Sequence, residues 1–186
     1  MNDAAREVPP RIRLVAWSDD DLGLLRETNA PEMTEHLGGP ESEAKVVSRH
    51  ATYTAMSTRP ADEGRMFRVV LDQTGEDVGS VGYWPRIWQG EAVYETGYGI
   101  LPAFRGRGLA VAALRAVVVE ARAAGGPREL HAYPSVDHIA SNNTCRNAGF
   151  TRVGEVAFEY PPGTWLRSHD WCVDLGDRVS PAACRS

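Results

Sequence analysis

The stretch 101-LPAFRGRGLA-110 carries the chain from the end of an expected strand directly into an amphipathic helix. The first amides of a helix lack partners within the helix, and the helix dipole adds positive potential at the same end. Gly106 and Gly108 remove side chains that would hold a ligand away from those amides, and Arg105 and Arg107 add charge-assisted donors. The stretch therefore favours a pyrophosphate site. A glycine-rich helix start with solvated arginines is the alternative that these residues alone leave open.

Two common phosphate-binding motifs do not fit this stretch. It lacks the Gly-Lys-Ser/Thr of a Walker loop, and it lacks the third glycine of the dinucleotide fingerprint. The helix is expected over 105–124, and the sequence 125-GGP-127 ends it. Its apolar face comprises Ala110, Val111, Leu114, Val117, Val118 and Ala121.

The other elements follow from hydrophobic periodicity, capping residues and glycine or proline breaks. Strands are expected at 11–17, 64–72, 77–84, 91–101, 128–133, 151–159 and 164–175, and the remaining helices at 19–29, 41–58 and 138–147. The order βααβββαβαββ predicts an α/β domain with a mixed sheet.

The composition is that of one folded domain. The chain has 186 residues, a formal net charge of −5 and 42% hydrophobic residues, which suffices for one core but not for two. We expect a single domain over 11–176, with flexible tails at 1–10 and 177–186. No apolar run approaches the roughly 20 residues that span a bilayer, and the N-terminus lacks an apolar signal region. A cytoplasmic protein with no membrane partner is expected.

The charged residues and cysteines narrow the function classes. The acidic balance speaks against a nucleic-acid partner. The cations are almost all arginine, with Lys45 the only lysine, which a GC-rich coding sequence explains. Cys145, Cys172 and Cys184 are odd in number and widely spaced, so free thiols are expected. The sequence has no CxxC or HxxxH pair, and no metal site is expected.

Three motifs in order resemble the GNAT superfamily of acyl-CoA-dependent N-acetyltransferases. Arg105, Gly108 and Ala110 match its Gln/Arg-x-x-Gly-x-Gly/Ala pyrophosphate motif. The stretch 137-DHIASNNTCRNAGF-150 resembles its Asn-x-Ala-Ser…Gly-Phe segment. The stretch 95-ETGYGIL-101 resembles the Glu-x-Gly-Tyr strand of the branch that includes ribosomal-protein N-terminal and antibiotic acetyltransferases. The resemblance extends over nearly the whole chain.

The resemblance implies the GNAT fold and its cofactor site. In that fold a central, mostly antiparallel sheet with flanking helices splays between strands 4 and 5, here the strand of Glu95 and the strand 128–133. Acetyl-CoA is expected in the V between them. The implied cofactor contacts are Ile100, Leu101, Arg105, Gly106, Arg107, Gly108, Leu109, Ala110, His138, Asn142 and Arg146. At His138 the family usually has asparagine, so a partial substitute in cofactor binding and a simple surface replacement both stay open.

Amine acetylation needs a base, because an amine is mostly protonated at neutral pH. Glu95 is the candidate base: it lies on the strand that would face the thioester, flanked by Tyr94 and Tyr98. Partial burial there would raise its pKa toward neutrality. A structural hydrogen bond, or contact with a cationic acceptor, is the alternative role.

The acid that protonates the leaving thiolate is less defined. Many GNAT enzymes have a tyrosine four positions after the residue corresponding to Ser141, and this chain has Cys145 there. The resemblance to the N-terminal acetyltransferase branch favours Ser141. Three alternatives stay open: Cys145 is the acid, Cys145 is a buried packing residue, or no protein acid is needed.

The acceptor pocket is expected on the face opposite the cofactor, between the first two helices and the last hairpin. Its candidate residues are Glu35, His36, Trp84, Tyr160 and Asp170. Aromatic rings with carboxylates suit a cationic amine. Aromatic residues at strand positions also fill cores, and Trp17, Trp84 and Trp171 could do so.

These residues predict an acetyl-CoA-dependent N-acetyltransferase that acts on a primary amine, most simply of a small molecule. Acetylation of a protein N-terminus is one alternative, because the Glu-x-Gly-Tyr strand resembles that branch. A non-catalytic acyl-CoA-binding module is another. Neither a metal nor a nucleic-acid partner is expected, and a homodimer is the assembly that the resemblance suggests.

Overall fold

The computed structural model describes residues 11–176, so the expected tails at 1–10 and 177–186 lie outside it. Its strands are β1 (Ile12–Ala16), β2 (Arg65–Leu71), β3 (Asp77–Trp88), β4 (Glu91–Ile100), β5 (Glu129–Ala132), β6 (Thr151–Glu159) and β7 (Trp165–Asp174). Its α-helices are α1 (Leu22–Thr28), α2 (Pro31–Thr34), α3 (Glu43–Met56), α4 (Leu109–Ala124) and α5 (Ile139–Ala148). The expected α/β fold class is confirmed, and the order of elements differs from the expected one only by the added short helix α2.

One mixed sheet contains all seven strands in the order β1-β2-β3-β4-β5-β7-β6. Every neighbouring pair is antiparallel except β4 and β5, which are parallel. The β4–β5 register covers only Tyr94 opposite Leu130 and Glu95 opposite His131. Beyond Glu95 the two strands have no registered partner residues, so β4 diverges from β5. This confirms the expected splay between the fourth and fifth strands.

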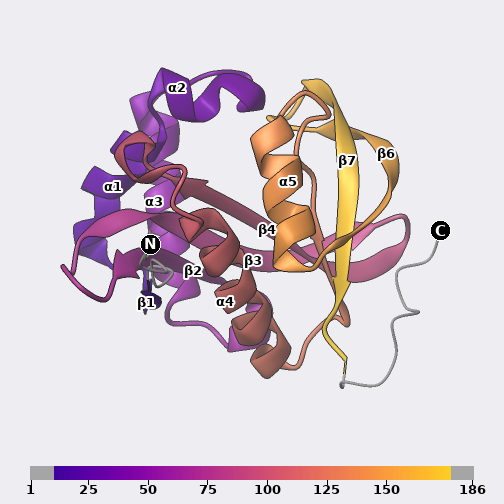
Figure 1. Cartoon of the computed structure of the whole chain (residues 1–186), viewed down its shortest axis with the longest axis horizontal. Coiled ribbons are helices and arrows are strands. Elements are labelled where there is room, and N and C mark those ends of the chain that lie inside the picture. Colours follow the sequence, from indigo (N-terminus) through magenta and orange to yellow (C-terminus); the bar gives the residue numbers. More distant parts are fainter. Residues whose placement is uncertain (1–10, 177–186) are drawn as a thin grey trace, which may run out of the picture.

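Helices cover both faces of the sheet (Figure 1). The larger core lies under α4, where Leu114 and Val117 pack with Val69 and Leu130 of the strands. On the other face, Trp17 and Val46 pack with Met66 beneath α1 and α3. Burying such side chains is worth about 1.5–3 kcal/mol each, and it fixes the β4 strand between two packed layers.

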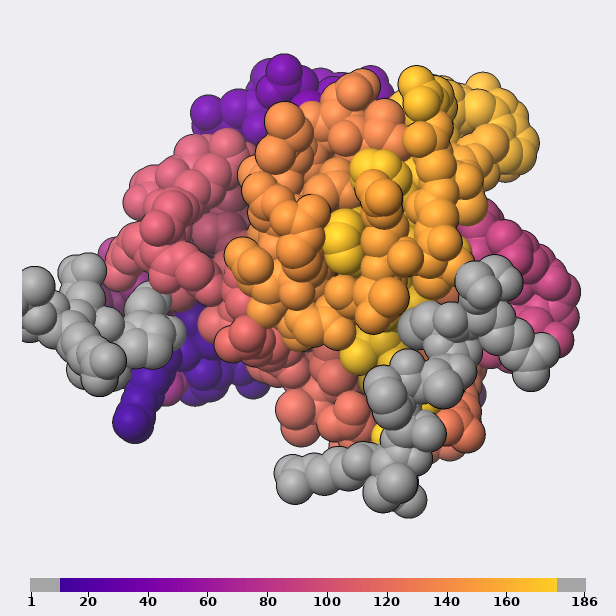
Figure 2. Space-filling model, turned by 45° about the vertical axis from the view of Figure 1, so that its right-hand side comes forward, coloured from indigo at the N-terminus to yellow at the C-terminus, as the bar shows by residue number. Residues whose placement is uncertain are grey.

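Helix α5 lies next to α4 and leads into the β6–β7 hairpin (Figure 1). Figure 2 shows this side of the surface, with the orange α5 segment between the pink β4–α4 region and the yellow β6–β7 hairpin. Trp171 of β7 is 4% exposed and belongs to the larger core, and Trp17 is 1% exposed in the smaller one. Both tryptophans therefore have the packing role that was left open.

Several element boundaries differ from the expected ones for local reasons. Helix α4 begins at Leu109 rather than at 105, because Gly106 and Gly108 adopt φ of 75°. Strand β3 continues past Pro85 to Trp88, because Gln89 and Gly90 both have positive φ and close a tight hairpin with β4. The short helix α2, with a proline at its start, was not expected as a separate element.

The cysteines also correct one expectation. Cys145 is a free, buried thiol, as expected. Cys172 is disulfide-bonded, so the expectation of a free thiol is wrong there. Cys184 lies outside the described residues.

None of the helices within residues 11–176 is long and apolar enough to cross a membrane.

Candidate active site

A single cleft of about 820 Å³ opens where β4 leaves β5. It is lined by β4, the β4–α4 turn, the segment after β5, the start of α5, and residues of α2 and α3. One wall is the strand edge itself, because β4 residues beyond Glu95 have no partner on that side. The cleft therefore exposes backbone amides and carbonyls together with side chains from both halves of the sheet.

The glycines of the opening stretch form one end of this cleft. Gly106 and Gly108 both line it, and Gly108 is the N-cap residue of α4. A Cβ at either glycine would meet no atom within 4 Å, so the space in front of the helix start is open. The unpaired amides and the positive helix end face that space, which suits an anion.

The cofactor residues expected from the resemblance fall into two groups. The first group lines the cleft and comprises Ile100, Arg105, Gly106, Gly108, Leu109, Ala110 and His138. The second group does not line it and comprises Leu101, Arg107, Asn142 and Arg146. The Arg105 side chain turns back and donates to the carbonyls of Ile100 and Glu32, both at 3.3 Å, so it links α2 to the β4–α4 turn. Arg107 lies over the ring of Phe104 at 5.8 Å.

Asn142 and Arg146 have structural partners instead. The Asn142 amide donates to the carbonyls of Ser135 and His138, and its oxygen contacts His169 at 2.7 Å and accepts from Trp171 at 2.9 Å. Arg146 lies over the Trp171 ring at 5.9 Å.

Glu95 lies in the cleft, and its side chain is 13% exposed. Its carboxylate accepts a hydrogen bond from Arg86 Nη1 at 2.6 Å. Burial raises the pKa of Glu95, while Arg86 and a hydrogen bond from Trp84 oppose that rise without cancelling it. The expected direction of the pKa is confirmed. A buried carboxyl with a raised pKa is a competent proton acceptor near neutral pH.

Arg86 is a site residue that the sequence analysis missed. Its guanidinium carbon lies 4.5 Å from the centre of the Phe158 ring, 5.5 Å from Trp88 and 5.6 Å from Tyr133. The signal in the sequence is the alternation of Trp84, Arg86 and Trp88, which puts all three side chains on one face of a strand. Without knowing that β3 pairs with β4, that alternation does not point to Glu95.

Trp84 lies opposite Glu95 in the β3–β4 register and lines the cleft. Its ring occupies the space that a side chain at position 97 would need, since a Cβ on Gly97 would come within 2.8 Å of the ring. Gly99 on the same face leaves room for Met33, whose terminal carbon would lie 3.1 Å from an added Cβ. Two glycines thus bring Trp84 and Met33 against the β4 backbone.

On the opposite face of β4, the Tyr98 hydroxyl lies 2.7 Å from Ser141 Oγ and 3.6 Å from Cys145 Sγ. Tyr98 and Ser141 line the cleft, whereas Cys145 is fully buried and does not. Burial raises the pKa of the Cys145 thiol to about 11, so it keeps its proton at neutral pH. Of the two candidate acids, Ser141 is the one whose hydroxyl borders the cleft.

His36 and His138 form a stacked pair across the cleft, with ring centres 4.1 Å apart. His36 follows α2, and His138 is the N-cap residue of α5, so the pair connects the two walls. Burial, followed by the charges of His36 and Arg105, lowers the pKa of His138 to about 4. His138 is therefore neutral at physiological pH.

The expected acceptor residues are brought together, except one. Glu35, His36, Trp84 and Tyr160 line the cleft. Asp170 is 2% exposed and does not line it. The Asp170 carboxylate instead contacts His131 Nδ1 at 2.6 Å and accepts from Trp88 at 3.0 Å, which ties β7 to β5 and to the end of β3.

Glu129, His131 and Cys172 form a cluster whose ligand atoms lie within 4.8 Å of one another. Cys172 is disulfide-bonded and His131 is engaged with Asp170. We therefore assign no metal to this cluster, and the metal-free site stays a prediction.

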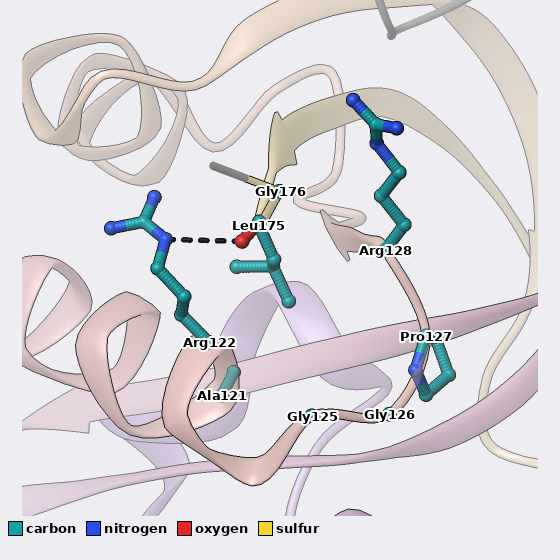
Figure 3. Close-up of a pocket in the computed structure, with 8 residues that line it drawn as sticks. All are labelled: Ala121, Arg122, Gly125, Gly126, Pro127, Arg128, Leu175 and Gly176. Atoms are coloured by element: carbon teal, nitrogen blue, oxygen red, sulfur yellow. Dashed lines mark hydrogen bonds between the residues drawn. The ribbon is translucent and has the colours of Figure 1, made fainter. Parts of the chain in front are cut away.

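A smaller hollow of about 190 Å³ lies at the far end of α4 (Figure 3). Arg122 donates to the Leu175 carbonyl at 3.1 Å along one of its walls, and Arg128 is paired with Asp174. Backbone of the glycine-rich turn after α4 forms much of the rest, so this hollow offers no acid, base or nucleophile for chemistry.

Comparison with known proteins places the chain in a family. Residues 11–151 match the acetyltransferase (GNAT) domain, which is most of the chain. The chain therefore belongs to the GNAT acetyltransferase family, and it is an acyltransferase. A search of curated protein sequences finds no match.

Solved structures agree on the fold. Aminoglycoside acetyltransferase AAC(6')-Ib in complex with coenzyme A is 18% identical with a TM-score of 0.70, covering 88% of this chain and 95% of that one. The RimL ribosomal L7/L12 alpha-N-protein acetyltransferase is 18% identical with a TM-score of 0.69, covering 88% and 90%. Spermidine N-acetyltransferase from Vibrio cholerae with CoA and spermine is 15% identical with a TM-score of 0.69, covering 88% and 95%.

Proposed function

We propose that this protein transfers the acetyl group of acetyl-CoA to a primary amine of a small molecule. The observation that carries the proposal is one continuous cleft with an anion-binding helix start at Gly106–Gly108 and a buried carboxylate, Glu95, further along β4. The helix start suits the pyrophosphate of the donor, and the Glu95 carboxylate suits the amine. Solved structures of the same fold contain CoA, which supports acetyl-CoA as the donor.

The reaction we propose is a direct attack. Glu95 takes a proton from the ammonium form of the acceptor, and the neutral nitrogen adds to the thioester carbonyl. The oxygen that becomes negative is stabilised by backbone N–H groups of the unpaired β4 edge. The carbon–sulfur bond then breaks, Ser141 donates a hydrogen bond to the leaving thiolate, and the second proton of the nitrogen reaches the sulfur through solvent. The products are an amide and free CoA.

The acceptor end of the cleft favours a compact cationic amine. Trp84 and Tyr160 supply aromatic surface there, and Glu35 and Glu95 supply negative charge. The stacked His36–His138 pair bridges the two walls of the cleft, and we expect it to leave less room for an extended peptide. Acetylation of a protein N-terminus is the second candidate, favoured by the fold shared with RimL. The cytoplasmic location and the homodimer stay predictions.

The first experiment measures CoA release from acetyl-CoA with a panel of polyamines, aminoglycosides and N-terminal peptides. We expect turnover with at least one small amine and none with peptides. Firm acetyl-CoA binding with no turnover on any amine would leave only an acyl-CoA-binding module.

A second experiment tests Glu95. Glu95→Gln should lower kcat by about a hundredfold, because a positioned base contributes roughly 10²–10⁴ in rate. The dissociation constant for acetyl-CoA should stay within about twofold, because the pyrophosphate end of the cleft is unchanged. An unaltered kcat would remove Glu95 from the mechanism.

A further inference from the structure

The Ser141 hydroxyl has a partner that the reaction just described does not use. Tyr98 on β4 and Ser141 on α5 lie 43 residues apart in the sequence, yet their hydroxyl oxygens are 2.7 Å apart. The contact crosses the splay between β4 and β5, because α5 follows β5 in the chain. It is therefore a link between the two walls of the cleft, made by two residues that both line it.

The position of this contact fits the sulfur of the acyl donor. Glu95 and Tyr98 are three residues apart on β4, about 10 Å along the strand, and they point to opposite faces of the sheet. A thioester in the gap beside β4 then lies between them. The amine approaches from the Glu95 side, and the thiolate departs toward the side on which Tyr98 and Ser141 meet.

The hydrogen bonds around Tyr98 allow two directions for the Ser141 hydrogen, since either hydroxyl can donate to the other. The phenol oxygen lies 2.7 Å from Ser141 Oγ, 3.2 Å from the Ser141 carbonyl and 3.6 Å from Cys145 Sγ. The shortest contact is the hydroxyl pair, which is a strong O–H···O distance. If Tyr98 donates to Ser141 Oγ, the hydrogen of Ser141 is released for an acceptor in the cleft.

Burial fixes the protonation states in this group. It raises the pKa of Tyr98 well above its ordinary value, and it raises the pKa of Cys145 to about 11. Both groups therefore keep their hydrogens at neutral pH. The Cys145 thiol can then donate to the phenol oxygen while the phenol donates onward to Ser141, so that donation runs in one direction toward the cleft.

Resting on the function proposed above, we propose that Tyr98 is a positioning residue that holds the Ser141 hydroxyl with its hydrogen directed at the leaving sulfur. No proton leaves Tyr98 in this arrangement. Its phenol supplies a hydrogen bond to Ser141 Oγ, and Ser141 in turn supplies one to the thiolate that forms when the carbon–sulfur bond breaks.

The test is a double-mutant cycle on kcat with the best amine found. Tyr98→Phe removes only the phenol oxygen. It should lower kcat about tenfold, because Ser141 then loses the hydrogen bond that directs its own hydrogen at the developing charge. The KM for acetyl-CoA should stay within about twofold, because the binding contacts are intact. Ser141→Ala should cost a similar factor, and the double variant should be no slower than the slower single variant.

Tyr94→Phe is the matched control. Tyr94 lies on the same strand and the same face, and its buried hydroxyl donates to the Asp62 carbonyl at 3.0 Å, away from the cleft. We expect this variant to keep the wild-type kcat while losing some thermal stability. If Tyr94→Phe lowers kcat as much as Tyr98→Phe does, Tyr98 has a packing role alone. Multiplying effects in the double variant would overturn the proposal, since Tyr98 would then act independently of Ser141.

Incorporation of 3-fluorotyrosine at position 98 keeps the test decisive if Tyr98→Phe does not fold. The fluorine makes the phenol a stronger donor with little change in shape, so kcat should change at position 98 and not at position 94. An unaltered kcat at both positions would contradict the positioning role. If the wild-type protein turns over no amine at all, the proposed function fails before this question arises, so the two failures are distinguishable.

Discussion

At the scale of single residues, Glu95 depends on Arg86. Their ion pair is 2.6 Å long, and the arginine opposes the rise in the Glu95 pKa that burial causes. Glu95 accepts a proton only when it is ionised, so activity falls as the pH drops through its raised pKa. Arg86→Gln removes the positive charge, which raises that pKa further. We expect the acidic limb of the kcat/KM profile to move to higher pH by about one pH unit.

Arg13→Gln is the control for this prediction. Arg13 forms an exposed pair with Asp72 at the edge of the sheet, far along the strand order from β4. Its replacement should leave the pH profile unchanged. An acidic limb that stays in place in Arg86→Gln, or moves to lower pH, would mean that a group other than Glu95 controls the profile.

At the scale of elements, the β5–β7 pairing includes a buried contact between His131 and the Asp170 carboxylate. Burial alone would lower the pKa of His131, but the hydrogen bond and charge of Asp170, with Glu129 beside them, outweigh burial and raise it. A raised histidine pKa stabilises the fold below the pKa of the unfolded chain, and this contribution is lost as the pH rises through the folded-state pKa. His131→Gln should therefore destabilise the protein more at about pH 6 than at about pH 9.

Urea unfolding of both proteins at the two pH values measures this difference. In an Asp170→Asn background, the same histidine change should show a much smaller pH dependence, because the carboxylate that raises the His131 pKa is gone. If the pH dependence persists in full in the Asp170→Asn background, a group other than the His131–Asp170 pair causes it.

At the scale of the whole molecule, the two halves of the sheet share only a short parallel register at Tyr94 and Glu95. A ligand in the cleft contacts both halves. We expect saturating acetyl-CoA to slow amide hydrogen exchange in residues 97–100 and 106–111, where backbone groups face the cleft, and to leave β1 unchanged. Mass spectrometry of peptides from the exchanged protein measures this. Protection confined to segments outside the cleft would contradict the assignment of this cleft as the donor site.

Much of the fold could be predicted from local patterns. The 101–110 stretch, the apolar face of the helix after it and the order of strands carry their own signals, because periodicity and capping act between near neighbours. The splay between β4 and β5 was predicted from the family resemblance, because no local pattern encodes where two parallel strands separate. Strand β3 was predicted to end at 84, but it continues through Pro85 to Trp88. The β2 pairing stops at Tyr83, so Pro85 lies where β3 has no β2 partner and a missing N–H is tolerated.

The site was harder to predict for a physical reason. Glu95 and Ser141 stand in motifs, so the sequence identifies them. Arg86 acquires its role only through the register that brings it near Glu95, and Tyr98 acquires its contact with Ser141 only through packing of α5. Asp170 was expected at the acceptor, but it is buried away from the cleft. Its burial depends on the end of β3, where Trp88 covers one face of β7, and no local pattern encodes that contact.

The two glycines of β4 also bear on how this enzyme could change its acceptor. At Gly97 and Gly99 the strand contributes no side chains, so Trp84 and Met33 lie directly against the backbone there. A larger residue at Gly97 would collide with the Trp84 ring, and one at Gly99 would require the terminal carbon of Met33 to shift. Smaller residues at Trp84 or Met33 would instead open volume without disturbing the strand. If the proposed function holds, we expect new acceptors to be reached more readily by mutations on β3 and α2 than by a larger side chain at Gly97.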